Sequence, residues 1–285
     1  MLRIITDTSA NLPAELIRQY DLCVIPFSYS IDGKEQSSPP GDFDGKAFYQ
    51  AMRVGAEIKT SMINTAAFTE VMQGFLEKGE DVLYIGMSGG VSGTAHAAAM
   101  AVEELREQYP QQNIAAVDTL AASLGEGLLV IEAARMREEG VCFADIVAYI
   151  DCVRHTMCQY FTVDDLEYLK RGGRLSRVAT VIGTVLRIKP ILTGDSEGKI
   201  VLCGKVRGRT ASLEALAERY ERLALDTTST VGIAHADDEE GAGALYAMLK
   251  KRGLTGKCLT VCYEPVTGAH VGPGTVALFF PGIRK

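Results

Sequence analysis

The sequence predicts an α/β protein with two domains: an N-terminal Rossmann-like parallel sheet flanked by helices, and a C-terminal α/β domain with a mixed sheet. In the N-terminal half, short β-rich apolar runs alternate with amphipathic helical runs, which is the pattern of a parallel sheet covered on both faces. In the C-terminal half this regular alternation changes. The length of 285 residues suits two domains that each bury a core. We therefore expect domains at residues 1–155 and 156–285.

The N-terminal domain is expected to begin with a strand at residues 3–7 and a helix capped by Asn11, with Pro13 in its first turn. A second strand is predicted at residues 22–29, followed by an irregular connection at 31–44. The later elements of this domain are predicted as helices at 46–52, 68–76, 95–108, 124–138 and 144–153 and strands at 81–85 and 114–118, with a polar segment at 59–65.

The C-terminal domain is expected to contain a short helix at residues 164–170 and, after a glycine-containing interruption, a strongly apolar helix at 178–186. Its other elements are predicted as strands at 158–163, 200–206, 231–235, 258–263 and 276–280 and helices at 213–223 and 245–249.

Composition excludes several classes of function. The net charge of −7 argues against a nucleic-acid surface, which needs a basic stripe. No apolar run approaches the roughly 20 residues that span a bilayer, and the N-terminus enters a strand without the layout of a signal peptide. The seven cysteines form no Cys-x-x-Cys pair, and the spacing of Cys152, His155 and Cys158 lacks a second cluster to complete a metal site. We expect a cytoplasmic protein with reduced thiols, no metal, no cofactor and no integral membrane segment.

The stretch at residues 85–94 predicts an anion-binding loop. It follows the strand predicted at 81–85 and precedes the helix at 95–108, so its backbone N–H groups and hydroxyls lie at a helix N-terminus. The lysine of a nucleotide triphosphate loop is absent, and no Gly-x-Gly-x-x-Gly occurs. Phosphate or carboxylate therefore remains possible as the anion, but nucleotide binding is weakly supported.

Ser92 in this loop has three interpretations. It can hydrogen-bond a ligand together with the N–H of Gly93, or it can cap the helix. It can also be the nucleophile of a serine esterase or acyltransferase, because Asp118 and His270 follow in the chain order of α/β-hydrolases. Thr94 stands where the nucleophile elbow normally has a glycine, which weakens the third interpretation.

Four further residues are candidates for the same site. Thr60 and Ser61 precede a helix, where capping is the simplest role, but the topology can bring them beside the loop. Glycines flank the segment around His270, which predicts a tight and exposed turn, where a histidine is often functional. Arg174 follows two glycines, a setting that suits carboxylate or phosphate binding, although a surface charge would look the same.

A series of motifs in chain order resembles the DegV family of bacterial fatty-acid-binding proteins. Each motif alone is modest, but the ordered series is specific and extends from about residue 3 to 283. The motifs are Ile5-Thr-Asp-Thr-Ser-Ala-Asn-Leu12, Lys59-Thr-Ser61, Ser88-Gly-Gly-Val-Ser-Gly-Thr94, Val117-Asp-Thr119, Val163-Asp-Asp-Leu-Glu-Tyr-Leu-Lys-Arg-Gly-Gly-Arg-Leu-Ser176, Ile188-Lys-Pro-Ile191, Lys205-Val-Arg-Gly208 and His270-Val-Gly-Pro-Gly274.

The resemblance implies a two-domain carrier that encloses one long-chain fatty acid, such as palmitate or oleate, with its carboxylate at the interdomain cleft. It further implies that Thr60 or Ser61 and Ser92 hydrogen-bond the carboxylate, with His270 beside it. Members of the family present the fatty acid to an ATP-using fatty acid kinase, so the chain would be the carrier subunit without catalytic residues of its own. Arg174 and Arg207 match positions linked to the head group and to kinase docking.

Two departures from the family pattern lie near the expected head group: Met62-Ile-Asn64 replaces the usual Gln-Pro-Ser, and Gly89 replaces a serine. The chemistry of the residues fits a fatty acid independently of the family. A buried carboxylate needs several donors, and a sixteen-carbon chain at about 0.8 kcal/mol per buried CH2 binds strongly. The candidates to line a tunnel, each also explained by an ordinary core, are Val178, Val181, Ile182, Val185 and Leu186. A regulatory module that senses acyl chains is a third hypothesis for function.

Overall fold

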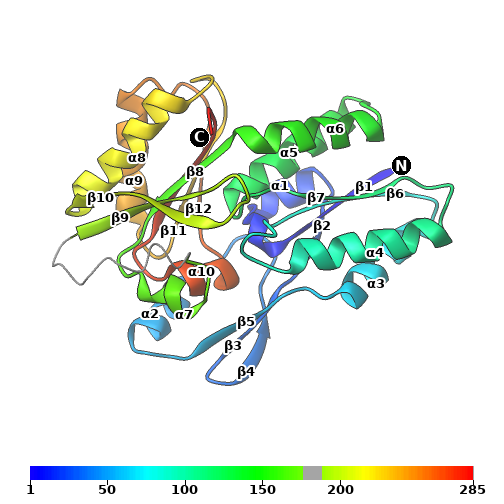
Figure 1. The fold of residues 1–285 in the computed structure, drawn as a ribbon, viewed down its shortest axis with the longest axis horizontal. Coiled ribbons are helices and arrows are strands. Elements are labelled where there is room, and N and C mark those ends of the chain that lie inside the picture. Colours follow the sequence, from blue (N-terminus) through cyan, green and yellow to red (C-terminus); the bar gives the residue numbers. More distant parts are fainter. Residues whose placement is uncertain (176–187, 285) are drawn as a thin grey trace.

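The computed structural model describes residues 1–175 and 188–284, and it confirms the α/β fold class (Figure 1). The predicted helix at 178–186, with its five tunnel candidates, lies outside the described residues. No helix in the described part of the chain is long and apolar enough to cross a membrane. The short 3-10 turns are η1 (Thr8–Ala10) and η2 (Arg154–Thr156).

The N-terminal half is built around a four-stranded parallel sheet with the order β2-β1-β6-β7. Its inner strands are almost entirely buried, because helices cover both faces. Figure 1 shows α3 and α4 on one side of this sheet and α5 and α6 on the other. The elements are β1 (Leu2–Asp7), α1 (Ala14–Gln19), β2 (Cys23–Ile25), α3 (Thr65–Leu76), β6 (Asp81–Gly86), α4 (Thr94–Gln108), β7 (Ile114–Asp118), α5 (Leu124–Glu138) and α6 (Phe143–Val153).

A three-stranded antiparallel sheet extends from this half, and the sequence-based prediction of this region was wrong. The predicted strand at 22–29 divides at Pro26, which has no N–H to continue a ladder, into β2 and β3 (Ser28–Ile31). The predicted irregular connection contains β4 (Lys34–Ser37), whose side chains are all exposed. The polar segment at 59–65 begins inside β5 (Ile58–Ser61), which pairs with β3 so that Thr60 lies opposite Tyr29. The helix α2 (Lys46–Arg53) connects β4 to β5.

The C-terminal half contains a six-stranded mixed sheet with the order β10-β9-β8-β13-β11-β12. Only β11 and β12 are parallel neighbours, and the last strand, β13, lies between β8 and β11. The strands are β8 (Met157–Thr162), β9 (Ile188–Gly194), β10 (Ile200–Arg207), β11 (Val231–His235), β12 (Cys258–Cys262) and β13 (Val276–Pro281). The helices are α7 (Glu167–Arg171), α8 (Arg209–Leu223), α9 (Glu239–Lys251) and α10 (Pro265–Val271).

The two halves meet along α5. An added Cβ at Gly232 in β11 would lie 2.6 Å from the Leu124 Cβ, and one at Gly125 would lie 3.0 Å from the Phe279 ring. The absence of side chains at these glycines therefore allows α5 to approach the C-terminal sheet closely. Helices α8 and α9 cover the opposite face of that sheet over a second core, which includes Tyr220. Because α5 contacts both sheets, the predicted boundary near residue 155 remains a prediction.

Candidate functional site

A partly open cavity lies where the N-terminal loops meet the C-terminal sheet. Apolar and aromatic side chains form most of its wall, with a few polar groups among them, which is the usual character of a small-molecule site. Five of the predicted ligand-binding residues line it, although they come from separate parts of the chain. These five residues are Thr60, Ser61, Ser92, Arg174 and His270.

Arg174 is a half-buried cation whose hydrogen-bond partners among the described residues are carbonyl groups. Its Nε donates to the Val91 carbonyl at 3.1 Å and its Nη1 to the Gly172 carbonyl at 2.5 Å. Burial lowers the pKa of Arg174 from its usual value. Among the described residues no carboxylate forms an ion pair with it, and residues 176–187 contain no Asp or Glu. The wall of the cavity therefore carries a positive charge that an anionic ligand would neutralise.

His270 lies in the last turn of α10 and is largely buried, so the predicted exposed turn was wrong. Glu264 caps this helix by accepting the N–H groups of Val266 and Thr267, and Pro265 occupies the first helical position, where its fixed φ suits a helix. The His270 Nε2 lies 2.9 Å from the Thr60 Oγ1, as donor or acceptor according to the tautomer.

The imidazole of His270 is uncharged at neutral pH. Burial and, less strongly, the positive charge of Arg174 together lower its pKa to about 4. An added Cβ at Gly172 would lie 2.3 Å from the His270 Nδ1, so the missing side chain there leaves room for the ring. The site thus combines one fixed cation with neutral hydrogen-bonding groups.

The glycine-rich loop adds a hydroxyl to the same wall. The Ser92 Oγ lies 2.8 Å from the Thr94 Oγ1 and accepts the Thr94 N–H at 3.3 Å, so it sits at the entry to α4. Gly93 precedes the helix, is exposed and lies outside the cavity lining. The two departures from the family pattern lie nearby: Met62 packs against Gly93, and the Gly89 N–H donates to Asp118 at 2.9 Å.

The hydrogen bonds of a catalytic triad are not formed among the described residues. His270 hydrogen-bonds Thr60 and not Ser92. The Asp118 carboxylate instead accepts the N–H groups of Gly89 and Leu120, at 2.9 and 2.8 Å. The contacts of Ser92 therefore fit a hydrogen-bonding residue better than an activated nucleophile.

Sequence reasoning missed much of the cavity wall, and it predicted as a ligand-binding residue Gly93, which is not part of the wall. Phe27, Gln159 and Phe161 line the cavity, but a strand pattern does not reveal which distant loop faces a strand residue. The buried Gln159 in an apolar strand was the available signal, since a buried amide needs partners. Arg207 is exposed at the end of β10, away from the cavity lining.

The fold and the cavity define an α/β protein with a mostly apolar cavity between its halves and an arginine in the cavity wall. The family profile described as "Uncharacterised protein, DegV family" matches residues 1–281. A DegV domain-containing protein of Clostridium perfringens is 37% identical over 284 residues, covering 99% of this chain and 98% of the relative. The chain therefore belongs to the DegV family.

Solved structures of similar proteins agree with this assignment. A DegV family protein from Thermus thermophilus, described by its fatty acid binding, has a TM-score of 0.88 and 29% identity, with 98% of each chain covered. A fatty acid binding DegV family protein from Streptococcus agalactiae has a TM-score of 0.87 and 32% identity, again with 98% of each chain covered. The two-domain α/β fold of these structures matches the fold of this chain.

Proposed function

We propose that this protein binds a long-chain fatty acid, with the carboxylate beside Arg174, His270, Thr60 and Ser92. The observation that carries the proposal is the half-buried Arg174 in a mostly apolar cavity, where its partners within residues 1–175 and 188–284 are two carbonyl groups and no carboxylate. A carboxylate supplies the missing negative charge and accepts charge-assisted hydrogen bonds, which are stronger than neutral ones. The fatty-acid-binding relatives from Thermus thermophilus and Streptococcus agalactiae support this ligand class.

The acyl chain occupies the apolar part of the cavity in this proposal. Phe161, Leu169, Ile200 and Phe279 belong to the wall on the side of the C-terminal half. Burying a chain such as that of palmitate or oleate contributes about 0.8 kcal/mol per CH2 group, so most of the affinity comes from the tail. The polar groups then orient the ligand.

The main test is to identify the ligand that accompanies the protein. Native mass spectrometry of the purified chain, followed by lipid extraction, is expected to show a fatty acid of about 14 to 18 carbons, the length that supplies the tail contribution above. Delipidated protein should regain the added mass with palmitate or oleate, and the uncharged methyl ester should bind more weakly than the acid. Protein that remains ligand-free and binds neither acid contradicts the proposal.

The protein acts as a carrier without catalytic residues of its own, in a compartment such as the cytoplasm where its seven free thiols stay reduced. A chromogenic-ester assay tests this part. The wild type and Ser92→Ala are both expected to show no turnover above background. Turnover that Ser92→Ala abolishes would instead support the serine esterase or acyltransferase.

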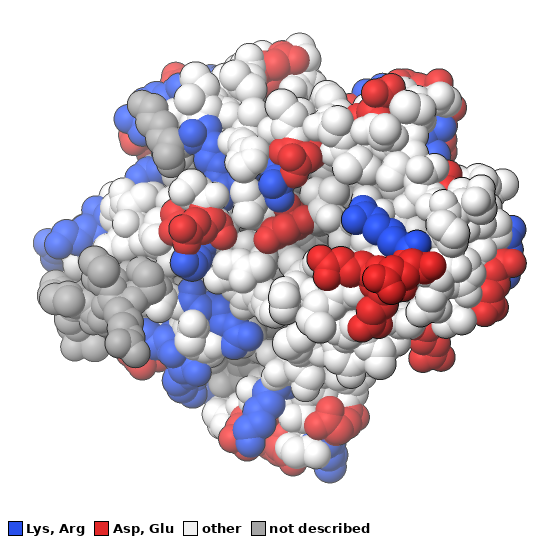
Figure 2. Space-filling model, turned by 45° about the vertical axis from the view of Figure 1, so that its right-hand side comes forward, with Lys and Arg blue, Asp and Glu red and all other residues white. Residues whose placement is uncertain are grey.

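The proposed partner is an ATP-using fatty acid kinase, which takes the bound acid as its substrate. Figure 2 shows Lys and Arg side chains gathered over the C-terminal half on this face of the molecule, and Arg207 is exposed at the end of β10. Arg207→Glu is expected to weaken kinase capture in a pull-down while the affinity for fatty acid stays unchanged. Recovery of a transcriptional regulator without a kinase would favour a regulatory module.

A further inference from the structure

A second group of buried polar residues, outside the cavity lining, joins the end of β1 to the start of α5. Asp7, Ser9 and Glu126 are each 0% exposed. The Ser9 Oγ lies 2.5 Å from the Asp7 Oδ1 and 2.7 Å from the Glu126 Oε2. One hydroxyl therefore bridges two buried carboxyl groups.

The number of hydrogens in this bridge requires a protonated carboxyl. A serine hydroxyl has one hydrogen and donates to one acceptor at a time. If Asp7 and Glu126 were both ionised, one of the two short contacts of Ser9 would join two oxygens with no hydrogen between them. A carboxylic acid that donates to the Ser9 Oγ supplies the missing hydrogen.

The hydrogen bonds assign that proton to Glu126. The Asp7 carboxylate accepts the Ser9 N–H at 2.9 Å and the Tyr84 hydroxyl at 2.5 Å, besides the Ser9 hydroxyl. Among the described residues, the Glu126 carboxyl has the Thr6 hydroxyl, at 3.1 Å, as its one side-chain donor besides the shared Ser9. More donors stabilise the charged form of a carboxyl, so Asp7 is the better carboxylate.

The surroundings favour the same assignment. Burial raises the pKa of Glu126 well above its usual range, and the charge of Asp7 and, less strongly, of Glu264 raises it further. Burial also raises the pKa of Asp7, but hydrogen bonds from Ser9 and Tyr84 oppose that rise. Asp118 is a further acidic group near Tyr84. Among residues 1–175 and 188–284, no Lys or Arg forms an ion pair with Asp7 or Glu126.

The bridge is linked to the helix that presents His270. Asn11 directly follows η1, donates to the Cys262 carbonyl at 2.9 Å and accepts the Glu264 N–H at 3.3 Å, just before α10. An added Cβ at Gly127 would lie 2.4 Å from the Ala10 carbonyl oxygen, so α5 and η1 are in close contact beside the bridge. A change in the bridge therefore displaces the anchor of α10.

We propose that Asp7 and Glu126 together retain one proton at neutral pH, carried by Glu126, and that this neutral acid positions η1 and, through Asn11, the helix α10. Glu126 is a positioning residue in this proposal and does not contact the ligand. The assignment of the proton is independent of the proposed fatty-acid function, whereas the effect on His270 as a ligand contact rests on it.

The amide substitutions Glu126→Gln and Asp7→Asn test the assignment. A glutamine amide reproduces the donor and acceptor of a protonated Glu126, so this variant is expected to unfold no more readily than the wild type at pH 7. An asparagine keeps one acceptor oxygen but turns its NH2 group toward the donors of either Ser9 or Tyr84, so Asp7→Asn is expected to raise the unfolding equilibrium constant at least about tenfold. The exposed Glu138→Gln on the same helix is the matched control. Stabilisation by both amides, or a Glu126→Gln as unstable as Asp7→Asn, would overturn the proposal.

The pH dependence of stability separates the loss of a retained proton from a simple loss of packing, because packing alone does not change with pH. Above the ordinary glutamate pKa of 4.5, the folded wild type holds a proton that the unfolded chain has released. Its stability therefore falls as pH rises, by up to about tenfold in the unfolding constant per pH unit relative to Glu126→Gln. Identical slopes for the two proteins between pH 5 and 7 would contradict a retained proton.

Carbon-13 NMR of the wild-type side-chain carboxyls keeps the test decisive if Asp7→Asn does not fold. At pH 7, the carboxyl resonance that disappears in Glu126→Gln is expected at the chemical shift of a protonated carboxyl. The chemical shift of an ionised carboxylate would overturn the assignment. Palmitate titrations then address the site: affinity should fall at alkaline pH in the wild type but not in Glu126→Gln. An equal loss of palmitate affinity at alkaline pH in both proteins would contradict the proposed effect of Glu126 on α10. Absence of palmitate binding at every pH would reject the proposed function and leave the proton assignment intact.

Discussion

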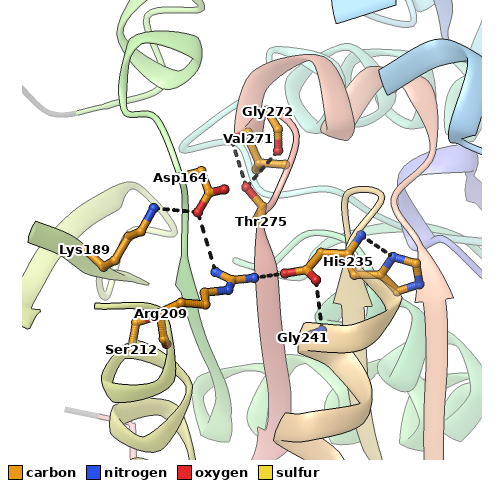
Figure 3. A network of polar contacts seen from close by, with 10 residues as sticks. Asp164, Lys189, Arg209, Ser212, His235, Gly241, Val271, Gly272 and Thr275 are labelled. Carbon is orange, nitrogen blue, oxygen red and sulfur yellow. Dashed lines mark hydrogen bonds and ion pairs between the residues drawn. The ribbon is translucent and has the colours of Figure 1, made fainter. Parts of the chain in front are cut away.

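Two half-buried arginines of this molecule differ in what neutralises them. Arg209, at the start of α8, forms ion pairs with Asp238 and, at 3.9 Å, with Asp164, which also binds the Lys189 Nζ at 2.6 Å (Figure 3). In the part of the chain that the structure describes, Arg174 has the carbonyls of Val91 and Gly172 as its partners. The first arginine belongs to a balanced network of two cations and two anions, whereas the second faces a cavity as an unneutralised charge.

The difference separates an arginine that stabilises the fold through ion pairs from one that is available to bind an anionic ligand. The Arg209 network joins α8 to the N-cap of α9 and to the loop after β8, because Asp238 also accepts the Gly241 N–H at 2.9 Å. Its two positive and two negative charges balance within the fold, although the buried Arg209 Nη1 has no hydrogen-bond partner among the described residues. Within the described chain, two carbonyl hydrogen bonds offset part of the cost of desolvating the Arg174 guanidinium, and the carboxylate of the proposed ligand would supply the negative charge.

The largest expected effect is on ligand affinity when the unneutralised charge is removed. Arg174→Gln should weaken fatty-acid binding by about 10- to 100-fold, because a hydrogen bond to a charged group contributes about 1.5–3 kcal/mol. The free energy of unfolding without ligand should not fall, since a desolvated cation is lost. Isothermal titration calorimetry with palmitate and denaturant unfolding measure the two quantities. Unchanged affinity for palmitate in this variant would contradict the role of Arg174 as the charge that binds the ligand.

The reciprocal change should reverse the pattern. Arg209→Gln leaves Asp238 without its cation and is expected to lower the free energy of unfolding by about 1–2 kcal/mol, given that these side chains are about a quarter exposed. Fatty-acid affinity should stay within about twofold, since the network lies outside the cavity wall. The same two measurements apply. A loss of affinity comparable to that of Arg174→Gln would show that the two regions are not separate.

Two histidines sharpen the comparison through pH. The positive charge of Arg174 adds to the burial that lowers the pKa of His270 to about 4, whereas the acidic neighbours of His235 partly oppose the lowering there. A group whose pKa is lowered on folding destabilises the protein as pH falls from its usual 6.5 toward the folded value. Replacing His270 with Asn should remove about 1–2 kcal/mol of that acid sensitivity, allowing for its partial exposure.

Ligand should act on only one of these histidines. A bound carboxylate stabilises a protonated imidazole, so saturating palmitate is expected to raise the pKa of His270 and leave that of His235 unchanged. Proton NMR titration of the imidazole signals, with and without palmitate, measures both values. Equal shifts at both residues would place the ligand elsewhere.

The smallest expected effects come from the neutral hydroxyls. Thr60→Val keeps the shape of the side chain but removes a neutral hydrogen bond, which contributes about 0.5–1.5 kcal/mol, so affinity should fall by only about 2- to 10-fold. Ser92→Ala should behave similarly. Competition with a fluorescent fatty acid resolves differences of this size. A loss larger than that of Arg174→Gln would mean that hydroxyls and not the arginine dominate recognition.

Local pattern was enough to predict the parallel sheet but not the antiparallel one. The buried runs at β1, β6 and β7 are short, apolar and separated by amphipathic helices, so each strand is recognisable alone. β4 has four exposed polar residues, and its pairing with β3 comes from a turn at Asp32 and Gly33, both with positive φ. The turn was a usable signal, whereas the composition of β4 was not.

The candidate site shows the same division between local and distant information. Nothing in the neighbourhood of Thr60 predicts a hydrogen bond to His270, because the two residues are 210 positions apart. Their association was expected only from the order of family motifs. The helix that carries His270 could have been predicted, since Glu264 and Pro265 form a capping signal that the flanking glycines obscured.

The position of β13 also sets the order in which the molecule is completed during synthesis. This strand is formed by residues near the end of the chain, yet it supplies the seam between β8 and β11 in the middle of the C-terminal sheet. Without β13, the strands β8, β9 and β10 have no hydrogen-bonded connection to β11 and β12. Pairing between strands that are distant in sequence is the slow part of folding. The wall of the cavity includes Phe279 of this strand, so the cavity is complete only after β13 has paired with both of its neighbours.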